Sequence, residues 1–469
     1  SDIFGIEVVP CIQTLAHYNQ LIRWYEHLNV FDIADVLLVG SPRVRELLDY
    51  VFKTIRECFT THRLNVGMDE AYFIGRGKYL DQHGQVDRFN IMKEQLDLVS
   101  ELSQKYGFKP MMWSDMFFRL AYDNYYETKA ELPSKIIDLV KGRFDVVYWD
   151  YYHVDPSHYD QMLKIHKLLN TNVYFAAGVW KWSGFTPDNR FGIRTMTAGI
   201  EACKNNDIPL VIMTGWGDNG AEASLFSILP GVVYASLARM DGIDIASEAD
   251  FLLKVLSGGL SMEEFMKVDS GNRAMIQDFP DLTNATNKSM TFNDPLLGVM
   301  DSLATFVKPE LFDQYALILN AKKYHQSKYA YVFETQQKLL SFLALKTDLG
   351  LKLRKAYQSK NSTELKKLAD SIPEILSRLD QFYEAFRFQW NFENKPHGFD
   401  VQDLRIGGLR QRLLSTKRKL DEYLDGRLEK VDELEEAILD YMGNGKEYTF
   451  DPRSFEHRLQ RVSSVNVND

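Results

Sequence analysis

Two adjacent carboxylates, Asp69 and Glu70, follow a short apolar run in the stretch LNVGMDEAYF (64–73). Two like charges side by side oppose each other's ionisation, so one carboxyl of such a pair can stay protonated near neutral pH. A protonated carboxyl beside a carboxylate is suited to general acid catalysis. Gly67 precedes the pair and lets the backbone come close to another group. The pattern predicts acid–base chemistry rather than a solvated acidic surface.

Tryptophans recur at equivalent places along the first half of the chain. A single tryptophan is more often a core residue, but five of the seven lie at or just after the ends of apolar runs. Sugar rings have apolar C–H faces and a polar rim, so flat aromatic walls with a few carboxylates suit a sugar pocket. The five are Trp113, Trp149, Trp180, Trp182 and Trp216.

A repeated unit positions these residues: a short apolar run, then a longer stretch with helical periodicity, up to about residue 240. Several runs are apolar on both faces, which is typical of parallel strands covered by helices. The unusual side chains stand at the run ends, as in a (β/α)₈ TIM-type barrel, and no GxGxxG turn indicates a doubly wound sheet. The runs are 5–10, 63–68, 108–117, 144–152, 172–180 and 208–216.

The remainder, 241–469, is predicted to be an α-helical C-terminal domain after a catalytic α/β barrel over 1–240. Ser261 and Glu264 have the spacing of a capping box, and Asn361 is placed to cap a long amphipathic helix. Another helical pattern covers 409–424.

Composition excludes some classes of partner. A net charge of -10 and a pI near 5.6 argue against nucleic-acid binding. No apolar run is long enough to span a membrane, so no membrane partner is expected. Cys11, Cys58 and Cys203 have no metal-ligand spacing and are interpreted as free buried thiols of a cytoplasmic protein.

The segments EVVPCIQTLAH, LNVGMDEAYF, MMWSDMFF, YWDYY and TGWGDNG resemble successive strand ends of glycoside hydrolase family 20, the exo-acting β-N-acetylhexosaminidases. The resemblance covers residues 5 to about 240, and FDVQDLRIGGLR (399–410) resembles the helical domain of one bacterial branch. The first run resembles the third strand of that family's barrel. The first two βα units, with the family's sugar-binding arginine, therefore have no counterpart in this sequence.

The resemblance implies a retaining, substrate-assisted mechanism without cofactor or metal. Glu70 would protonate the leaving glycosidic oxygen and then activate water. Asp69 would hold the 2-acetamido N–H while the acetamide oxygen attacks the anomeric carbon. Neighbours on an extended chain point apart, so the two carboxylates are expected to face different parts of the substrate.

The resemblance also implies a binding pocket for a terminal β-linked N-acetylhexosamine. Trp113, Trp149 and one of Trp180 or Trp182 would form aromatic walls, and Trp216 with Asp218 would form the floor. Tyr151 is preferred to Tyr152 as the tyrosine on the acetamide oxygen, because it shares the strand parity of Trp149. His17 and Asn219 are candidate rim residues, and Asp115 and Asp150 are candidates for orienting Trp or His side chains.

Two alternatives remain open at this point. A barrel hydrolase could use carboxylates from two strands, such as Glu70 with Asp115 or Asp218, and would need no acetamido group. The other alternative is a non-catalytic barrel that binds sugar. The sequence leaves open the choice between GlcNAc and GalNAc, and a homodimer formed through the helical domain is a further expectation.

Overall fold

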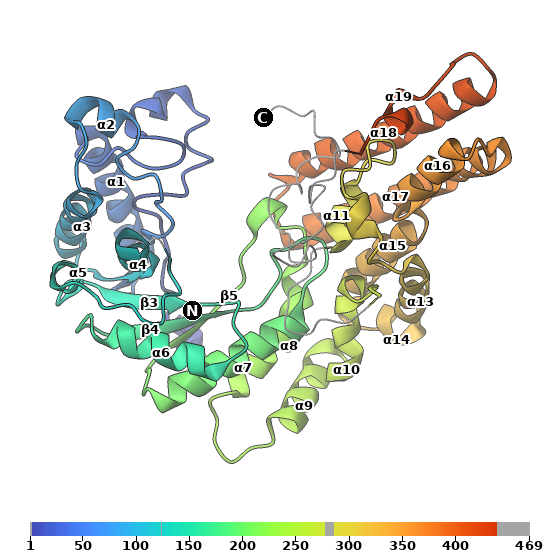
Figure 1. Ribbon diagram of the computed structural model, residues 1–469. Coiled ribbons are helices and arrows are strands. Elements are labelled where there is room, and N and C mark those ends of the chain that lie inside the picture. Colours follow the sequence, from blue (N-terminus) through green and yellow to red (C-terminus); the bar gives the residue numbers. More distant parts are fainter. Residues whose placement is uncertain (1, 123, 277–285, 439–469) are drawn as a thin grey trace. The chain divides into compact units, whose positions relative to one another are not determined.

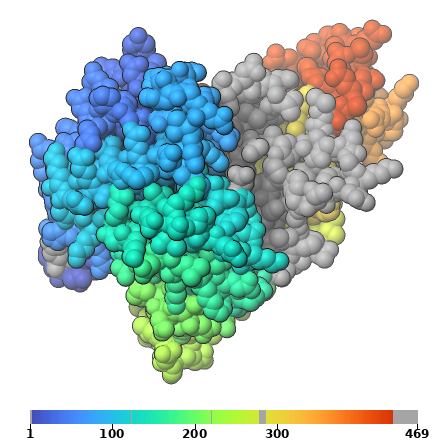
Figure 2. Space-filling model, turned by 60° about the vertical axis from the view of Figure 1, so that its left-hand side comes forward, coloured from blue at the N-terminus to red at the C-terminus, as the bar shows by residue number. Residues whose placement is uncertain are grey.

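The computed structural model describes residues 2–122, 124–276 and 286–438. The chain divides into two compact units, unit 1 over 1–177 and 197–212 and unit 2 over 178–196 and 213–469. Unit 1, blue to blue-green in Figure 2, presents a continuous surface. The predicted domain boundary near residue 240 stays a prediction.

Five strands form one sheet in the order in which they occur along the chain. Neighbours from β1 to β4 pair in parallel, and Figure 1 shows β3 and β4 side by side. A sequential order fits barrel topology, whereas a doubly wound sheet reverses order at a switch point. The α/β fold with a parallel sheet is confirmed, and closure into eight strands stays a prediction. The strands are β1 (Arg63–Asn65), β2 (Lys109–Trp113), β3 (Asp145–Trp149), β4 (Val173–Gly178) and β5 (Val211–Thr214).

The first predicted run, 5–10, is not a strand. Pro10 accepts a hydrogen bond from Asn65 N–H at 3.0 Å, and Ile12 donates to the Asn65 carbonyl at 2.9 Å. These bonds form a single parallel bridge between Cys11 and Asn65. The residues before Pro10 do not extend this pairing with β1, and Ile6 and Val8 are exposed. The other five runs each contain a strand, shorter than predicted.

Helices alternate with the strands of unit 1. The longest pair, α1 and α3, pack on each other, and α1 buries Val44, Leu48 and Phe52 at a spacing of four residues. Aspartate caps begin two of the helices: Asp87 accepts from Phe89 N–H, and Asp155 accepts from Ser157 N–H. The helices are α1 (Pro42–Cys58), α2 (Lys78–His83), α3 (Arg88–Lys105), α4 (Asp115–Tyr122), α5 (Ser134–Val140) and α6 (Pro156–Lys167); α7 (Asn189–Asn205) is shared with unit 2.

Unit 2 is helical after β5, as predicted. Ser261 and Glu264 form the capping box, and Asn361 accepts from Glu364 N–H at 3.0 Å to begin α17. The longer helices are α8 (Leu229–Leu237), α9 (Ile245–Ser257), α13 (Pro309–Leu319), α15 (Ala330–Lys346), α16 (Leu349–Gln358), α17 (Ser362–Glu393) and α18 (Phe399–Leu424). The short ones are α10 (Met262–Phe265), α11 (Thr286–Phe292), α12 (Asp301–Ala304), α14 (Lys322–His325) and α19 (Asp432–Glu435).

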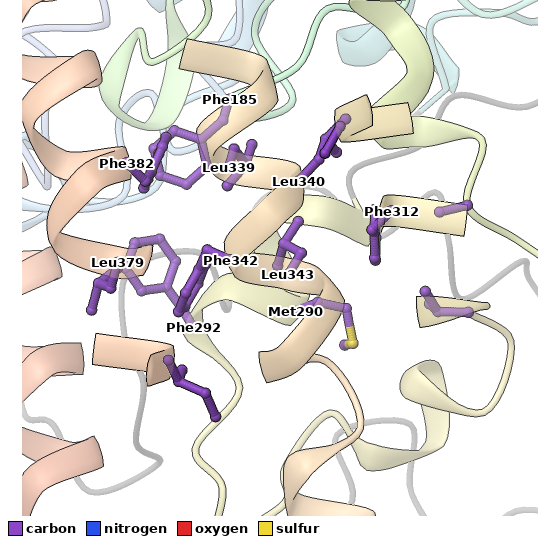
Figure 3. Close-up of a cluster of buried hydrophobic side chains, with 14 of the residues drawn as sticks. Phe185, Met290, Phe292, Phe312, Leu339, Leu340, Phe342, Leu343, Leu379 and Phe382 are labelled. Atoms are coloured by element: carbon purple, nitrogen blue, oxygen red, sulfur yellow. The ribbon is translucent and has the colours of Figure 1, made fainter. Parts of the chain in front are cut away.

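Helix α15 runs through the hydrophobic core of unit 2. Its Leu339, Leu340, Phe342 and Leu343 are fully buried, and Figure 3 shows them among apolar side chains from several other segments. Figure 1 shows α15, α17 and α18 next to one another. Phe185, which follows the tryptophans of the β4 loop, packs edge-on against Phe382 of α17, with ring centroids 5.2 Å apart. This loop is therefore fixed by the helical core.

Two expectations about exposure can be compared with the structure. Across the described ranges, every helix is too short or too polar to span a membrane. The three cysteines are free, but only Cys203 is buried, so the prediction of burial is wrong for Cys11 and Cys58. Cys11 directly follows the first predicted run and pairs with β1 at one point only, and Cys58 ends α1.

Candidate active site

A sharp turn after β1 carries the carboxylate pair. Gly67, Met68 and Glu70 all have left-handed backbone conformations, with φ of 71°, 71° and 53°. A Cβ atom on Gly67 would lie 2.7 Å from the carbonyl oxygen of Ile12, so glycine is needed for the close approach of these two segments. Non-glycine residues in this conformation store strain, which is common at functional sites.

Both carboxylates of the pair lie beside one imidazole. His17 Nε2 is 3.2 Å from Asp69 Oδ2 and 3.7 Å from Glu70 Oε2. The expectation that Asp69 and Glu70 point apart on an extended chain is wrong, because the left-handed conformation of Glu70 replaces the extended one. The structure thus brings three predicted site residues together.

Further side chains fix the two acids. Gln13 donates from Nε2 to Asp69 Oδ1 at 3.0 Å, and Tyr72 donates its hydroxyl to Glu70 Oε1 at 2.9 Å. Sequence reasoning missed both as site residues. Gln13 and His17 both follow the first run, which was a usable signal for Gln13. Nothing in the sequence indicated Tyr72, because its position depends on the turn.

The charges around His17 favour its protonated form. Its hydrogen bond to Asp69 raises the pKa of His17 to about 9 against the opposing effect of burial, and the charges of Asp69, Glu70 and Asp35 add to the rise. Asp35 Oδ2 also accepts from the His17 backbone N–H at 3.0 Å. The site therefore holds an imidazolium between two acids at neutral pH.

Asp115, at the start of α4, supports the pair from within the fold. It is fully buried; its Oδ2 accepts from Glu70 N–H at 3.0 Å, and its Oδ1 accepts from Trp149 Nε1 at 3.4 Å. Burial raises the pKa of Asp115, and the nearby charge of Asp69 raises it further. One carboxyl thus orients both the acid pair and an aromatic side chain. This agrees with the expectation that Asp115 orients a tryptophan.

Aromatic residues end β2 and β3. Trp113 and Trp149 are almost fully buried, and Trp149 stacks on Tyr151 with ring centroids 5.4 Å apart and an interplanar angle of 22°. The two side chains therefore lie on the same side of the chain, as their shared strand parity predicts. Tyr152 is 41% exposed, whereas Tyr151 is 5% exposed.

The other predicted site residues belong to unit 2. Trp180 and Trp182 stack on each other with centroids 4.3 Å apart, and both are buried. Trp216 follows β5, and its carbonyl accepts a hydrogen bond from Lys181 Nζ at 3.3 Å. Asp218 is exposed and begins a 3₁₀ turn, Asp218–Gly220, which includes the backbone of Asn219; the side chain of Asn219 lies outside the described structure.

The loop with Trp216 and Asp218 is anchored by the helices of unit 2. Glu222 is buried and pairs with Lys288 Nζ at 2.7 Å and with Arg405 Nη1 at 3.1 Å. Gln402 donates to the carbonyl of Gly220 at 3.2 Å, and Glu393 accepts from Leu225 N–H at 2.7 Å. The helical domain therefore holds the loop that was predicted to form the floor of the pocket.

One group of described residues has the composition of a metal site. Asp150, His153 and His158 each offer a ligand atom, and these atoms lie within 4.8 Å of one another. Asp150 thus contacts histidines, as the sequence suggested for it.

Comparison with known proteins identifies the helical region. Residues 263–450 match the model of the Glycoside Hydrolase 20C C-terminal domain. A comparison with curated proteins found no significant match.

Solved structures give weaker likenesses. They include a Flavobacterium johnsoniae chitobiase (11% identity, TM-score 0.37, covering 92% of this chain and 62% of the chitobiase). A Bacteroides fragilis β-N-acetylhexosaminidase has 18% identity and a TM-score of 0.36, covering 54% of this chain and 52% of the relative. An O-GlcNAc hydrolase mutant from Thermobaculum terrenum has 10% identity and a TM-score of 0.38, covering 84% and 80%.

These identities and scores are too low to assign an activity, and the chain spans less than two thirds of the chitobiase. The helical region, in contrast, matches the model of a defined glycoside hydrolase domain. The match covers less than half of the chain, and it identifies residues 263–450 as similar to the C-terminal domain of glycoside hydrolase family 20.

Proposed function

We propose that this protein is an exo-β-N-acetylhexosaminidase that removes terminal β-linked GlcNAc or GalNAc from the non-reducing end of glycans. The observation that carries the proposal is the convergence of Asp69 and Glu70 on His17 at the end of β1. Two acids on one turn suit a mechanism in which the acetamido group of the substrate is the nucleophile, because no second catalytic carboxylate is then needed on the opposite side of the sugar.

The surroundings of the two acids fit different roles. Glu70 is the more accessible, with 36% of its side chain exposed, and would donate its proton to the leaving oxygen and later accept one from water. The side chain of Asp69 is 15% exposed and is held by Gln13 and His17. Each of its oxygens keeps acceptor capacity, so Asp69 could receive the acetamide N–H and stabilise the oxazolinium intermediate.

The structure disfavours Asp115 as a second catalytic carboxylate. Asp115 has no exposed surface, and both of its oxygens accept hydrogen bonds from the protein. A nucleophile on a sugar would need an accessible oxygen, whereas this arrangement suits a positioning residue. We assign Trp149 to the sugar-binding wall and Tyr151, which stacks on it at the end of β3, to the acetamide oxygen of the substrate.

A pair of chromogenic substrates tests the proposal. The 4-nitrophenyl β-glycoside of N-acetylglucosamine should release nitrophenol, and the plain β-glucoside without the acetamide should not. Hydrolysis of both would indicate a two-carboxylate enzyme, and hydrolysis of neither, including the N-acetylgalactosamine analogue, would contradict the proposal.

Variants of Glu70 and Asp69 test whether these two acids catalyse the hydrolysis. Glu70→Gln should lower kcat by about 10² to 10⁴-fold on substrates with poor leaving groups, since it removes the proton that is donated. Asp69→Asn should lower kcat on the acetamido substrate. Glu57 is an exposed acid on α1, and Glu57→Gln is the matched control. It should leave kcat on the acetamido substrate unchanged.

A further inference from the structure

The carboxyl end of β3 carries a cluster of three side chains that the proposed reaction does not use. Asp150 Oδ2 lies 2.8 Å from His153 Nδ1 and 3.3 Å from His158 Nε2. Asp150 is almost fully buried, while His153 and His158 are 34% and 14% exposed. An ion could therefore reach the cluster from solvent and find a carboxylate already in place.

The distances in the cluster match those between ligands that share a metal ion. Nitrogen and oxygen ligands lie about 2.0 to 2.1 Å from Zn²⁺, so two of them are about 3.3 Å apart in tetrahedral geometry. In octahedral geometry the separation is about 2.9 Å. The two nitrogen–oxygen separations, 2.8 and 3.3 Å, fall close to this range.

The carboxylate is oriented by groups outside the cluster. Its Oδ1 accepts from the backbone N–H groups of Tyr152 at 3.0 Å and His153 at 3.4 Å, and its Oδ2 accepts from the Tyr148 hydroxyl at 2.7 Å. Hydrogen bonds of this kind orient carboxylate ligands in metal sites.

The two imidazoles are also fixed by their surroundings. Their rings stack with centroids 3.5 Å apart at 13°, and the ring of Tyr126 lies against His153 at 5.1 Å. The Tyr159 hydroxyl donates to the carbonyl of His153 at 2.7 Å, and His158 lies in the first turn of α6. Because the rings are nearly parallel, both lone pairs can point at one ion only after one ring turns out of the stack about its soft terminal torsion.

Hydrogen bonding within the protein accounts for only part of this cluster, the 2.8 Å bond between His153 Nδ1 and Asp150 Oδ2. The Nε2 atom of His158 is buried and makes no hydrogen bond to the described residues, although it lies near Asp150. Buried polar atoms are normally satisfied, so such an atom needs a ligand. Asp150 Oδ2 already accepts from Tyr148 and lies 2.8 Å from His153 Nδ1, so the second imidazole has only a longer contact with it, at 3.3 Å.

We propose that Asp150, His153 and His158 bind one late first-row divalent cation, of which Zn²⁺ is the representative. Two imidazoles and one carboxylate suit zinc and its neighbours, whereas Ca²⁺ and Mg²⁺ prefer oxygen ligands alone. The cation would tie the loop after β3 to the start of α6. This loop carries Tyr151 and Tyr152, so the ion would stabilise the aromatic end of β3 without entering the chemistry.

Zinc binding by the whole chain tests this inference. The protein is stripped with a chelator, dialysed, and titrated with ZnCl₂ in a calorimeter, and we expect one site. His153→Ala and His158→Ala should each weaken binding by at least about tenfold, because each removes a ligand. Mg²⁺ should give no heat at the same site.

Controls separate this site from others. His17→Ala, which changes the carboxylate pair, and His397→Ala, an exposed histidine of unit 2, should bind Zn²⁺ as the unaltered protein does. Zn²⁺ should raise the Tm of the unaltered protein and of the controls but not that of His158→Gln, which guards against a variant that fails to fold. Absence of binding, or equal binding by the His153 and His158 variants, would overturn the inference whether or not the protein hydrolyses hexosaminides.

Discussion

The imidazole of His17 links the two acids of the site. Its position depends on a left-handed backbone, with φ of 65° at His17 itself, and on the acceptor Asp35. A protonated imidazole between two carboxylates lowers their mutual repulsion, so the pair can be held on one turn.

The pH dependence of stability follows from His17. Because its folded pKa is raised from 6.5 to about 9, the protonated form stabilises the fold fully below pH 6.5, and this contribution is lost as the pH rises through 9. The Tm should therefore fall between pH 6.5 and 9. In His17→Asn, which tolerates the left-handed backbone, the fall should be smaller. Thermal unfolding of both proteins across pH 6 to 9.5 measures this, and identical slopes would contradict it.

Single residues were predicted better than their contacts. The sequence indicated Asp69, Glu70 and His17 from residue type and position, and it indicated partners for Asp115 and Asp150. It could not indicate that Tyr72 bonds Glu70, because that contact exists only once Glu70 adopts a left-handed φ. The same torsion made the expectation of diverging carboxylates fail.

At the scale of elements, strand positions were predictable because apolar runs between turns mark buried parallel strands. Helix starts were predictable where a capping residue is present, as at Ser261 and Asn361. The first run could not be assigned in this way, since the single bridge to β1, at Cys11 directly after the run, depends on pairing and not on the composition of the run. The turn after β1 likewise depends on Gly67.

Gly67→Ala should disrupt this turn. The added Cβ would meet the carbonyl of Ile12 and would also strain a φ of 71°, so we expect a loss of about 1 to 3 kcal/mol and a marked fall in kcat. Gly107→Ala is the matched control, since Gly107 has the same φ and no atom within 4 Å of the new Cβ. Urea denaturation and the hexosaminide assay compare the two. Equal effects would show that strain alone, not the contact with Ile12, explains the loss.

Asn361→Ala should remove the cap of α17. The side chain accepts from Glu364 N–H, and loss of such a cap costs about 1 kcal/mol. Asn391→Ala, on the exposed surface of the same helix, should have a smaller effect. Denaturant midpoints of the two variants measure the difference, and equal midpoints would argue that the cap contributes nothing.

At the scale of the whole molecule, the helical domain supports the loop after β5. Glu222 has almost no exposed surface and bonds two cations from separate helices, Lys288 of α11 and Arg405 of α18. Its sequence position gave no sign of this role, since an acid after a glycine-rich turn usually faces solvent. The partners are distant in sequence and become visible only in the folded structure.

Glu222→Ala should destabilise unit 2 strongly. It leaves Lys288 buried without its carboxylate, and breaking a buried ion pair in this way costs about 3 to 5 kcal/mol. Glu384→Ala, which breaks an exposed pair with Arg387, should cost less than about 1 kcal/mol. Thermal and urea unfolding of both variants provide the comparison, and Glu222→Gln serves if the alanine variant does not fold. Equal destabilisation would contradict the role of the buried pair.

The sequence separations between Glu222 and its partners Lys288 and Arg405 affect how the protein folds during synthesis. Glu222 leaves the ribosome 66 residues before Lys288 and 183 residues before Arg405. At the usual pace of translation, the second separation corresponds to about 10 to 40 s. During that interval the nascent chain has a carboxylate that still lacks the cation from α18. The loop with Trp216 and Asp218 can therefore reach its final form only after most of the C-terminal helices have been synthesised.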